Sequence, residues 1–367
     1  MIDLGDTRAP VPPDVLRAPG GFAWWYADLV TPGGDGAVLI WSYGLPFLPG
    51  YASAARRGAG ELPASRPSVN LAVYRGGAPA FYLLQEHAPA PEGEGRPAGV
   101  QEIGGCRFVR TFDGRYCTLG ADLDLALPGT RARLTGTFRL RGVARLSPES
   151  GPAADAPHLW TPMTGPAEGE VRLEVGGCPF VELAGRAYHD RNHGRVPLHD
   201  LGIARWMWGR VPLARTERIY YLLWPSSSAA RPVCLGVEIG EDGETRRVEV
   251  EAELVRERRG LSGVARPERI LLRAGRRPWL IVDHARTVEA GPFYLRLLSR
   301  GTTGEGESAL GWSELCVPDR VDLPLHRPLV RMRVHRAQGP NSRWLPLFTG
   351  PREGRVGRLL RHFLAPG

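Results

Sequence analysis

Hydrophobic and polar positions alternate with a period of two along much of the chain. Clear runs cover Ala132–Leu146, Glu170–Gly177, Arg218–Pro225, Arg246–Glu257 and Glu268–Gly275. Successive side chains of a strand point to opposite faces of a sheet, so this alternation predicts half-buried strands. Turn-forming sequences such as PGGDG, RGGAP, FDGR and GEDGE separate many runs, and few stretches show a helical period. The pattern predicts a mostly β protein with antiparallel strands in barrels or sandwiches.

The length of the chain predicts two domains. Its 367 residues exceed what one hydrophobic core usually serves. The longest polar, turn-rich gap, Ser147–Pro157, fits a linker, but it also fits a long hairpin loop because strand-like alternation resumes directly after it. We therefore place the boundary near Asp200, with an N-terminal domain over residues 1–200 and a C-terminal domain over residues 201–367.

The two chain ends carry different signals. The tail from Pro340 to Gly367 contains GRVGRLLRHFL, whose leucines and Phe363 fit one face of a short amphipathic helix. We expect this helix to dock on the barrel rather than to act as a membrane anchor. The N-terminal MIDLGDTRAPVPPDVLRAPGG has acidic residues and prolines where a signal peptide needs a basic start and an apolar core. No apolar stretch reaches the length of a bilayer span, so we expect a cytoplasmic protein.

The formal charge is +8, and all 47 basic residues are arginines spread along the chain. No basic run is interleaved with aromatic residues as in proteins that bind single-stranded nucleic acid, so no nucleic-acid partner is expected. Weak attraction to an anionic membrane surface, at the inner face of the membrane, stays compatible with this charge.

Metal, disulfide and cofactor signals are weak. The five cysteines are odd in number, widely spaced and without a CxxC pair, so small buried hydrophobic roles are expected. His189 and His193 have the i, i+4 spacing of helical metal ligands, but Gly194 and Pro197 argue against a helix there. No phosphate loop or dinucleotide fingerprint occurs. We therefore expect neither a metal nor a cofactor.

The sequence YHDRNHG, from Tyr188 to Gly194, combines acid–base side chains near a turn signal. If it ends a strand, alternation places Tyr188, Asp190 and Asn192 on one face and the two histidines on the other. A carboxyl group in an apolar site keeps its proton and donates it to a weakly basic carbon. Alternatively, Asp190 and Asn192 tie down a turn before Gly194 by bonding backbone N–H groups. Both interpretations stay open from the sequence.

Aromatic side chains are dense in three stretches, GGFAWWYADLV, LIWSYGLPFLPGY and RWMWGR. A core accounts for most of these rings. A ring-lined pocket also holds a polyene or terpenoid and stabilises a developing carbocation. The candidates for such a pocket are Trp24, Tyr26, Trp41, Trp206 and Trp208. A further cluster, GWSELCVPDR, offers Glu314, for which an ion pair that positions a loop is preferred over a role in a site.

Several stretches, in their order along the chain, resemble one known family. They are PGGFAWWYADLV, HLWTPM with EVRLEV, GRAYHDRNHG with RWMWGR, GPFYLRLLSR and GWSELCVPDR. They resemble the carotenoid 1,2-hydratase (hydroxyneurosporene synthase) family and related proteins with two lipocalin-like domains. The resemblance implies two lipocalin-like antiparallel β-barrel domains, no redox cofactor, and addition of water to a terminal C=C bond of an acyclic carotenoid.

Residues and resemblance together predict a mechanism. Protonated Asp190, oriented by Tyr188, delivers a proton to the alkene of an apolar substrate, and the cation forms against the tryptophans. Water held by Asn192 or His193 then captures the cation. Two rivals remain: a non-hydrating cyclase or pericyclase that only folds a polyene, and a lipocalin-type carrier with a purely structural polar cluster.

Overall fold

The computed structural model describes residues 2–89, 99–146, 156–227, 231–260 and 263–364, with the side chains described as far as residue 360. Within these ranges the strands form one sheet of 14 strands and one of nine. The strands of the first sheet are β1 (Ile2–Leu4), β2 (Phe22–Val30), β3 (Gly36–Tyr43), β4 (Pro67–Arg75), β5 (Ala78–Glu86), β6 (Val100–Ile103), β7 (Cys106–Asp113), β8 (Tyr116–Ala126), β9 (Arg133–Ala144), β10 (His158–Pro162), β11 (Thr164–Val175), β12 (Cys178–Gly194), β22 (Val334–Arg336) and β23 (Gly350–Pro351).

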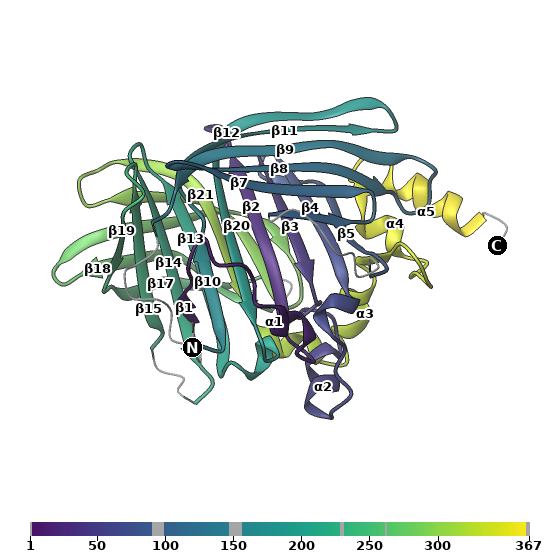
Figure 1. Ribbon diagram of the computed structural model, residues 1–367, viewed down its shortest axis with the longest axis horizontal. Coiled ribbons are helices and arrows are strands. Elements are labelled where there is room, and N and C mark those ends of the chain that lie inside the picture. Colours follow the sequence, from purple (N-terminus) through teal and green to yellow (C-terminus); the bar gives the residue numbers. More distant parts are fainter. Residues whose placement is uncertain (1, 90–98, 147–155, 228–230, 261–262, 365–367) are drawn as a thin grey trace.

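The main path of this first sheet is β22-β5-β4-β3-β2-β12-β11-β9-β8-β7-β6, while β10 pairs with β12 and with β1, and β23 pairs with β5. Neighbouring strands are antiparallel except in the pairs β1 with β10 and β22 with β5. The sheet curls strongly, so that β7, β8, β9 and β11 cross over the top of the molecule while β2 to β5 run downward (Figure 1).

The second sheet lies beside the first (Figure 1). Its strands are β13 (Ile203–Pro212), β14 (Thr216–Pro225), β15 (Val233–Gly240), β16 (Thr245–Val248), β17 (Glu251–Arg259), β18 (Ala265–Ala274), β19 (Arg277–Ala290), β20 (Tyr294–Thr303) and β21 (Ser308–Cys316). They are joined in the order β16-β15-β14-β13-β21-β20-β19-β18-β17. The predicted mostly β fold with antiparallel strands is confirmed, and both sheets are curled (Figure 1).

Short helices connect and close these sheets. They are α1 (Pro13–Arg17), α2 (Tyr51–Arg56), η1 (Pro63–Ser65), η2 (Leu198–Asp200), η3 (Pro318–Asp322), α3 (Arg327–Arg331), α4 (Leu345–Phe348) and α5 (Arg355–Leu364). The chain leaves the first sheet after β12, passes through η2 into the second sheet, and returns after β21 to place β22 and β23 on β5. The short helix expected near the C-terminus is α5. Among the helices of the described residues, none has the length and apolar character of a transmembrane helix.

In the described residues, the three larger hydrophobic cores follow from the alternation of side chains. One fills the inside of the curled first sheet and contains Trp25 and Trp41. One fills the inside of the second sheet and contains Met207. The third lies between the sheets, where Tyr26 and Trp208 meet side chains of the opposite sheet. Because neighbours in a strand face opposite ways, Tyr26 joins the layer between the sheets while Trp25 joins the inner core.

Close packing between the sheets requires a glycine in β3. A Cβ on Gly36 would lie 2.6 Å from Cζ2 of Trp312 and 2.3 Å from the carbonyl oxygen of Leu29. The missing side chain lets the buried Trp312 reach across from β21 and donate its indole N–H to that carbonyl over 3.3 Å.

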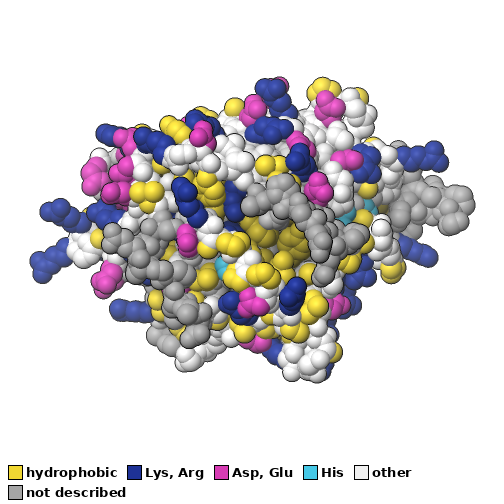
Figure 2. Space-filling model, in the orientation of Figure 1, with side chains coloured by type: hydrophobic (Ala, Val, Ile, Leu, Met, Phe, Trp, Pro, Cys, Tyr) yellow, Lys and Arg dark blue, Asp and Glu magenta, His cyan; other side chains and the backbone are white. Residues whose placement is uncertain are grey.

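On the face shown in Figure 2, arginine and acidic side chains are interspersed toward the rim, and hydrophobic side chains gather near the centre.

Candidate active site

Strand register brings polar and aromatic side chains together on the face of the first sheet that meets the second. In β12, Asn192 pairs with Trp24 of β2 and, on its other side, with Trp160 of β10. Two residues earlier, Asp190 pairs with Tyr26 of β2. Side chains paired across neighbouring strands share a face, so these five residues form one wall of the layer between the sheets.

Asp190 is the centre of a buried hydrogen-bond network. Its Oδ2 accepts the indole N–H of Trp160 over 2.8 Å and the hydroxyl of Tyr188 over 3.1 Å. Its Oδ1 accepts a side-chain N–H of Asn192 over 3.0 Å. Asn192 is in turn paired with His158, whose Nε2 lies 2.9 Å from the amide oxygen. These bonds fix the orientation of the carboxyl group, and they join side chains of β12 and β10 in mid-sheet.

Burial controls the protonation of Asp190. The residue is 3% exposed, and loss of hydration raises the pKa of its carboxyl group from 3.8 to about 8. The bonds from Trp160 and Tyr188 act in the opposite direction because they stabilise the carboxylate, but they do not outweigh burial. At neutral pH Asp190 is therefore mainly a neutral acid, held in place by three donors.

The second sheet supplies the facing wall. In β21, Glu314 pairs with Trp208 of β13 and with Arg296 of β20. The Arg296 guanidinium donates to Oε1 of Glu314 through Nε over 3.0 Å and through Nη2 over 2.8 Å. Trp208 stands edge-on to Tyr26 with ring centroids 5.3 Å apart, so the walls are in direct contact at that point.

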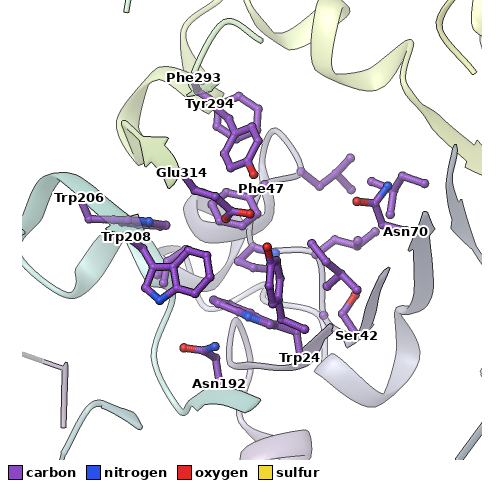
Figure 3. Close-up of a pocket in the computed structure, with 18 of the residues that line it drawn as sticks. Trp24, Ser42, Phe47, Asn70, Asn192, Trp206, Trp208, Phe293, Tyr294 and Glu314 are labelled. Carbon is purple, nitrogen blue, oxygen red and sulfur yellow. The ribbon is translucent and has the colours of Figure 1, made fainter. Parts of the chain in front are cut away.

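A cavity of about 190 Å³ lies between these walls. Asp190 and Asn192 line it from the first sheet, and Glu314 and Arg296 line it from the second. Figure 3 shows Trp24, Trp206 and Trp208 around this space, with Phe47, Tyr294 and Glu314 above Trp24 and Asn192 below it. The cavity therefore combines an acid, an arginine-bound carboxyl group and several aromatic faces.

The structure separates two predicted residues from the others. Trp41 lies in the inner core of the first sheet, where its ring meets Phe108 at 5.6 Å. His193 lies on the opposite face of β12 from Asp190, and burial lowers its pKa to about 3. Tyr188 is fully buried and does not line the cavity, but it bonds Asp190 and packs against Trp208, whose ring centre lies 5.7 Å from its own.

Sequence reasoning missed two residues that contact the candidate acid network. His158 and Trp160 stand two positions apart in HLWTP, so in a strand they share a face. The same period-two argument that grouped Tyr188 with Asp190 also groups these two side chains. What the sequence lacks is the pairing of β10 with β12, which brings the two groups into contact.

A buried ion cluster joins the sheets close to Tyr188. Arg210 of β13 donates from Nε to both carboxylate oxygens of Asp28 in β2, over 2.9 and 3.0 Å. Its Nη1 donates to Glu217 over 3.0 Å, and all three side chains are fully buried. The two carboxyl groups hold the pKa of Arg210 above its ordinary value. None of the three lines the cavity, so they serve the contact between the sheets.

A second buried network borders the cavity on the side of β5. Tyr74 donates to Oε2 of Glu289 over 2.6 Å and accepts from Arg296 over 2.5 Å. Arg333 binds the other oxygen of Glu289, and its guanidinium lies 4.2 Å from the ring centre of Tyr82.

In the described part of the chain, no three His, Cys, Asp or Glu side chains are grouped as metal ligands. The five cysteines are free thiols, three of them buried.

Known proteins resemble this chain over most of its length. The model of the family described as carotenoid hydratase CrtC matches residues 44–343. A protein named hydroxyneurosporene dehydrogenase, from Chlorobaculum tepidum, is 27% identical over 352 residues, which are 88% of this chain and 89% of the relative. A protein named acyclic carotenoid 1,2-hydratase, from Thiocapsa roseopersicina, is 28% identical over 329 residues, which are 89% of this chain and 76% of the relative.

Among solved structures, one from Nitrosomonas europaea, provisionally described as AttH, shares the fold. It matches with a TM-score of 0.57 and covers 84% of this chain and 99% of its own, at 17% sequence identity.

Proposed function

The chain belongs to the carotenoid hydratase CrtC family, and on this premise we propose that it adds water to a terminal C=C bond of an acyclic carotenoid or related polyene, without a cofactor. The observation that carries the proposal is Asp190, a carboxyl group whose pKa burial raises to about 8 in an aromatic cavity. An alkene carbon is a weak base, so its protonation requires an acid that still holds its proton at neutral pH.

The first step is transfer of a proton from Asp190 to the alkene. Oδ2 already accepts bonds from Trp160 and Tyr188, whereas Oδ1 accepts one bond from Asn192. The transferable proton is therefore assigned to Oδ1. As the O–H bond of Asp190 breaks, a C–H bond forms at one alkene carbon and positive charge develops on the more substituted neighbour. The faces of Trp24, Trp206 and Trp208 stabilise that charge through their quadrupoles.

The second step is capture of the cation by water. The water oxygen forms the new C–O bond and releases one proton, which Glu314 accepts. Arg296 engages Oε1 of Glu314 twice, so Oε2 is assigned as the accepting oxygen. Turnover leaves Asp190 ionised and Glu314 protonated, and exchange with solvent restores both. Asn192 acts as a positioning residue, because its amide bonds both Asp190 and His158.

The volume of the cavity fits the end of a polyene rather than the whole chain. An engineered apolar cavity of about 150 Å³ binds benzene, and this cavity measures about 190 Å³. A space of this size places one terminal double bond beside Asp190 and excludes a complete carotenoid. The proposal therefore places the reaction at the chain end.

Product analysis tests the proposal against the two alternatives. The purified protein is incubated with detergent-dispersed neurosporene or lycopene in water enriched in oxygen-18. Hydration gives a product heavier than the substrate by one labelled water. A cyclase gives an isomer of unchanged mass, and a carrier returns the substrate unaltered while retaining it in the bound fraction. Either of those outcomes contradicts the proposed hydration.

A further inference from the structure

Exposed hydrophobic side chains concentrate near the C-terminus. Of the ten large hydrophobic side chains exposed in the described part of the chain, three are Leu62, Leu146 and Val233. The other seven are Leu323, Leu325, Leu329, Trp344, Phe348, Val356 and Leu360. We call these seven the C-terminal patch. Six of them form pairs four residues apart: Leu325 with Leu329, Trp344 with Phe348, and Val356 with Leu360. In helical turns this spacing places both members of a pair on one face.

The net charge of the chain also concentrates there. Residues 323–364 contain nine arginines and one glutamate, a formal charge of +8. The whole chain has 47 basic and 39 acidic residues, also +8, so the 38 basic and 38 acidic residues outside this segment cancel. Arg327, Arg331, Arg343 and Arg352 are exposed. The arginines are thus spread along the chain, as the sequence indicated, but the net formal charge lies in this segment. Three of its nine arginines pair with acids outside it, Arg327 with Asp322, Arg333 with Glu289 and Arg336 with Glu86, so the exposed arginines without such a pair carry the excess.

The patch adjoins the cavity that holds Asp190. A second cavity, of about 550 Å³, is lined by Leu329 and Phe348 of the patch and by the exposed Arg352. Tyr82, Glu289, Pro292 and Arg333 line both cavities. Figure 1 shows α4 and α5 together at one end of the molecule, beyond β5. The second cavity therefore lies between the patch and the candidate active site.

We propose that the C-terminal patch docks on an anionic lipid bilayer and that the second cavity admits the polyene from it; this inference rests on the proposed function. The cavity beside Asp190 holds only the end of a long apolar chain, so the remainder needs a continuous apolar route. Leucine, tryptophan and phenylalanine insert into the boundary between headgroups and acyl chains, and arginines bind anionic headgroups. If two copies of the chain docked through this patch, two clusters of arginines would face each other. Their repulsion disfavours a second copy of the chain as the partner of the patch.

Sedimentation with lipid vesicles tests this surface. We expect the protein to bind vesicles of equal parts phosphatidylcholine and phosphatidylglycerol, to bind phosphatidylcholine vesicles far less, and to be released by salt. The triple variant Leu325→Gln, Trp344→Gln, Leu360→Gln should lower the partition coefficient on the order of tenfold or more. These residues do not line either cavity. The matched control is Leu62→Gln, Leu146→Gln, Val233→Gln, which alters the three exposed large hydrophobic side chains that lie outside the patch in the described part of the chain and should bind normally.

A second pair of variants isolates the charge. Arg331→Gln, Arg343→Gln removes two exposed arginines that line neither cavity, and should weaken binding about fivefold for each arginine removed. Arg75→Gln, Arg276→Gln removes the same charge at exposed positions elsewhere and should bind as the wild type does. Equal loss in both variants would mean that only the overall charge matters, which overturns the assigned surface. Sedimentation velocity gives a further test. If the wild type is a dimer that does not bind vesicles, and the triple leucine and tryptophan variant is a monomer, the patch is a dimer interface and the proposed membrane surface is overturned.

Activity on detergent-dispersed polyene separates this inference from the proposed function. The patch variants should hydrate dispersed substrate at the wild-type rate and lose activity only toward substrate presented in anionic vesicles. Vesicle binding without hydration by the wild type would contradict the proposed function and leave the surface standing. Hydration without vesicle binding would contradict the surface alone.

Discussion

Asp190 and Glu314 face the same cavity from different sheets, Asp190 from β12 of the first and Glu314 from β21 of the second. Their surroundings differ in kind. Asp190 is surrounded by neutral donors and aromatic rings, and burial raises its pKa to about 8. Glu314 is bound by the guanidinium of Arg296. Two carboxyl groups in unlike surroundings fit the two halves of the proposed hydration, in which Asp190 is the acid and Glu314 the base.

Replacing Asp190 by Asn should slow hydration strongly with little effect on folding. The amide keeps the size of the side chain but has no proton to transfer, so the hydration rate should fall by about 10²–10⁴-fold. Product formation and melting temperature are measured on the same preparations. A lower melting temperature with normal turnover per folded molecule would instead assign Asp190 a purely structural role.

The rate should decrease as the pH rises through about 8. Only the protonated form of Asp190 donates, and its pKa is raised by burial to about 8. Replacing Trp160 by Phe removes a hydrogen bond that lowers this pKa, so the decrease should move to higher pH. Trp41→Phe is the matched control, because Trp41 lies in the inner core and should leave the pH profile in place. An identical pH profile in the Trp160 variant would contradict the assignment.

Part of this site follows from the sequence and part does not. Alternation alone groups Tyr188, Asp190 and Asn192 on one face, since strand geometry fixes the direction of neighbouring side chains. The contacts of Trp160 and Glu314 depend on strand pairings between distant segments. A single sequence does not specify such pairings, because many registers satisfy the same alternation.

The fold shows the same division. The strands, their antiparallel arrangement and the terminal helix follow from hydrophobic patterning and turn residues. The pairing of β22 and β23 with β5 does not follow from the sequence. These strands are three and two residues long, which is too short to show an alternation of hydrophobic and polar residues. That pairing positions α3, α4 and α5 beside the second cavity, so the sequence alone gives no indication that this segment borders a site.

The stability of the wild type should decrease with rising pH relative to that of Asp190→Asn. Between the ordinary value of 3.8 and the folded value of about 8, folded Asp190 keeps a proton that the unfolded chain releases. The folded state therefore binds more protons, and the free energy of unfolding falls as pH rises, by up to about 1.4 kcal/mol per pH unit. Denaturant unfolding of both proteins at pH 5 and pH 7.5 measures the difference. Parallel pH dependences would show that Asp190 is not protonated when folded.

Replacing Asp28 by Asn should destabilise the contact between the sheets without touching the cavity. The change leaves the fully buried Arg210 with one carboxyl partner instead of two. Breaking a buried ion pair costs about 3–5 kcal/mol. Asp122→Asn, in the exposed pair with Arg139, is the control and should cost at most about 1 kcal/mol. Equal effects in denaturant unfolding would mean that the buried cluster contributes no more than a surface pair.

Replacing Glu314 by Gln tests which group takes the proton from water. Gln keeps the size of the side chain and an oxygen that accepts from Arg296, but it is not a base. If Glu314 accepts the proton, the rate should fall by about 10²–10⁴-fold, while the residual activity still decreases as pH rises through about 8, because Asp190 is unchanged. Glu217→Gln is the matched control: it also removes a carboxyl group that binds a buried arginine, but it does not line the cavity. That control should lose stability and keep its turnover per folded molecule. Near-normal turnover in Glu314→Gln would show instead that the Asp190 carboxylate takes the proton back from water and serves as both acid and base.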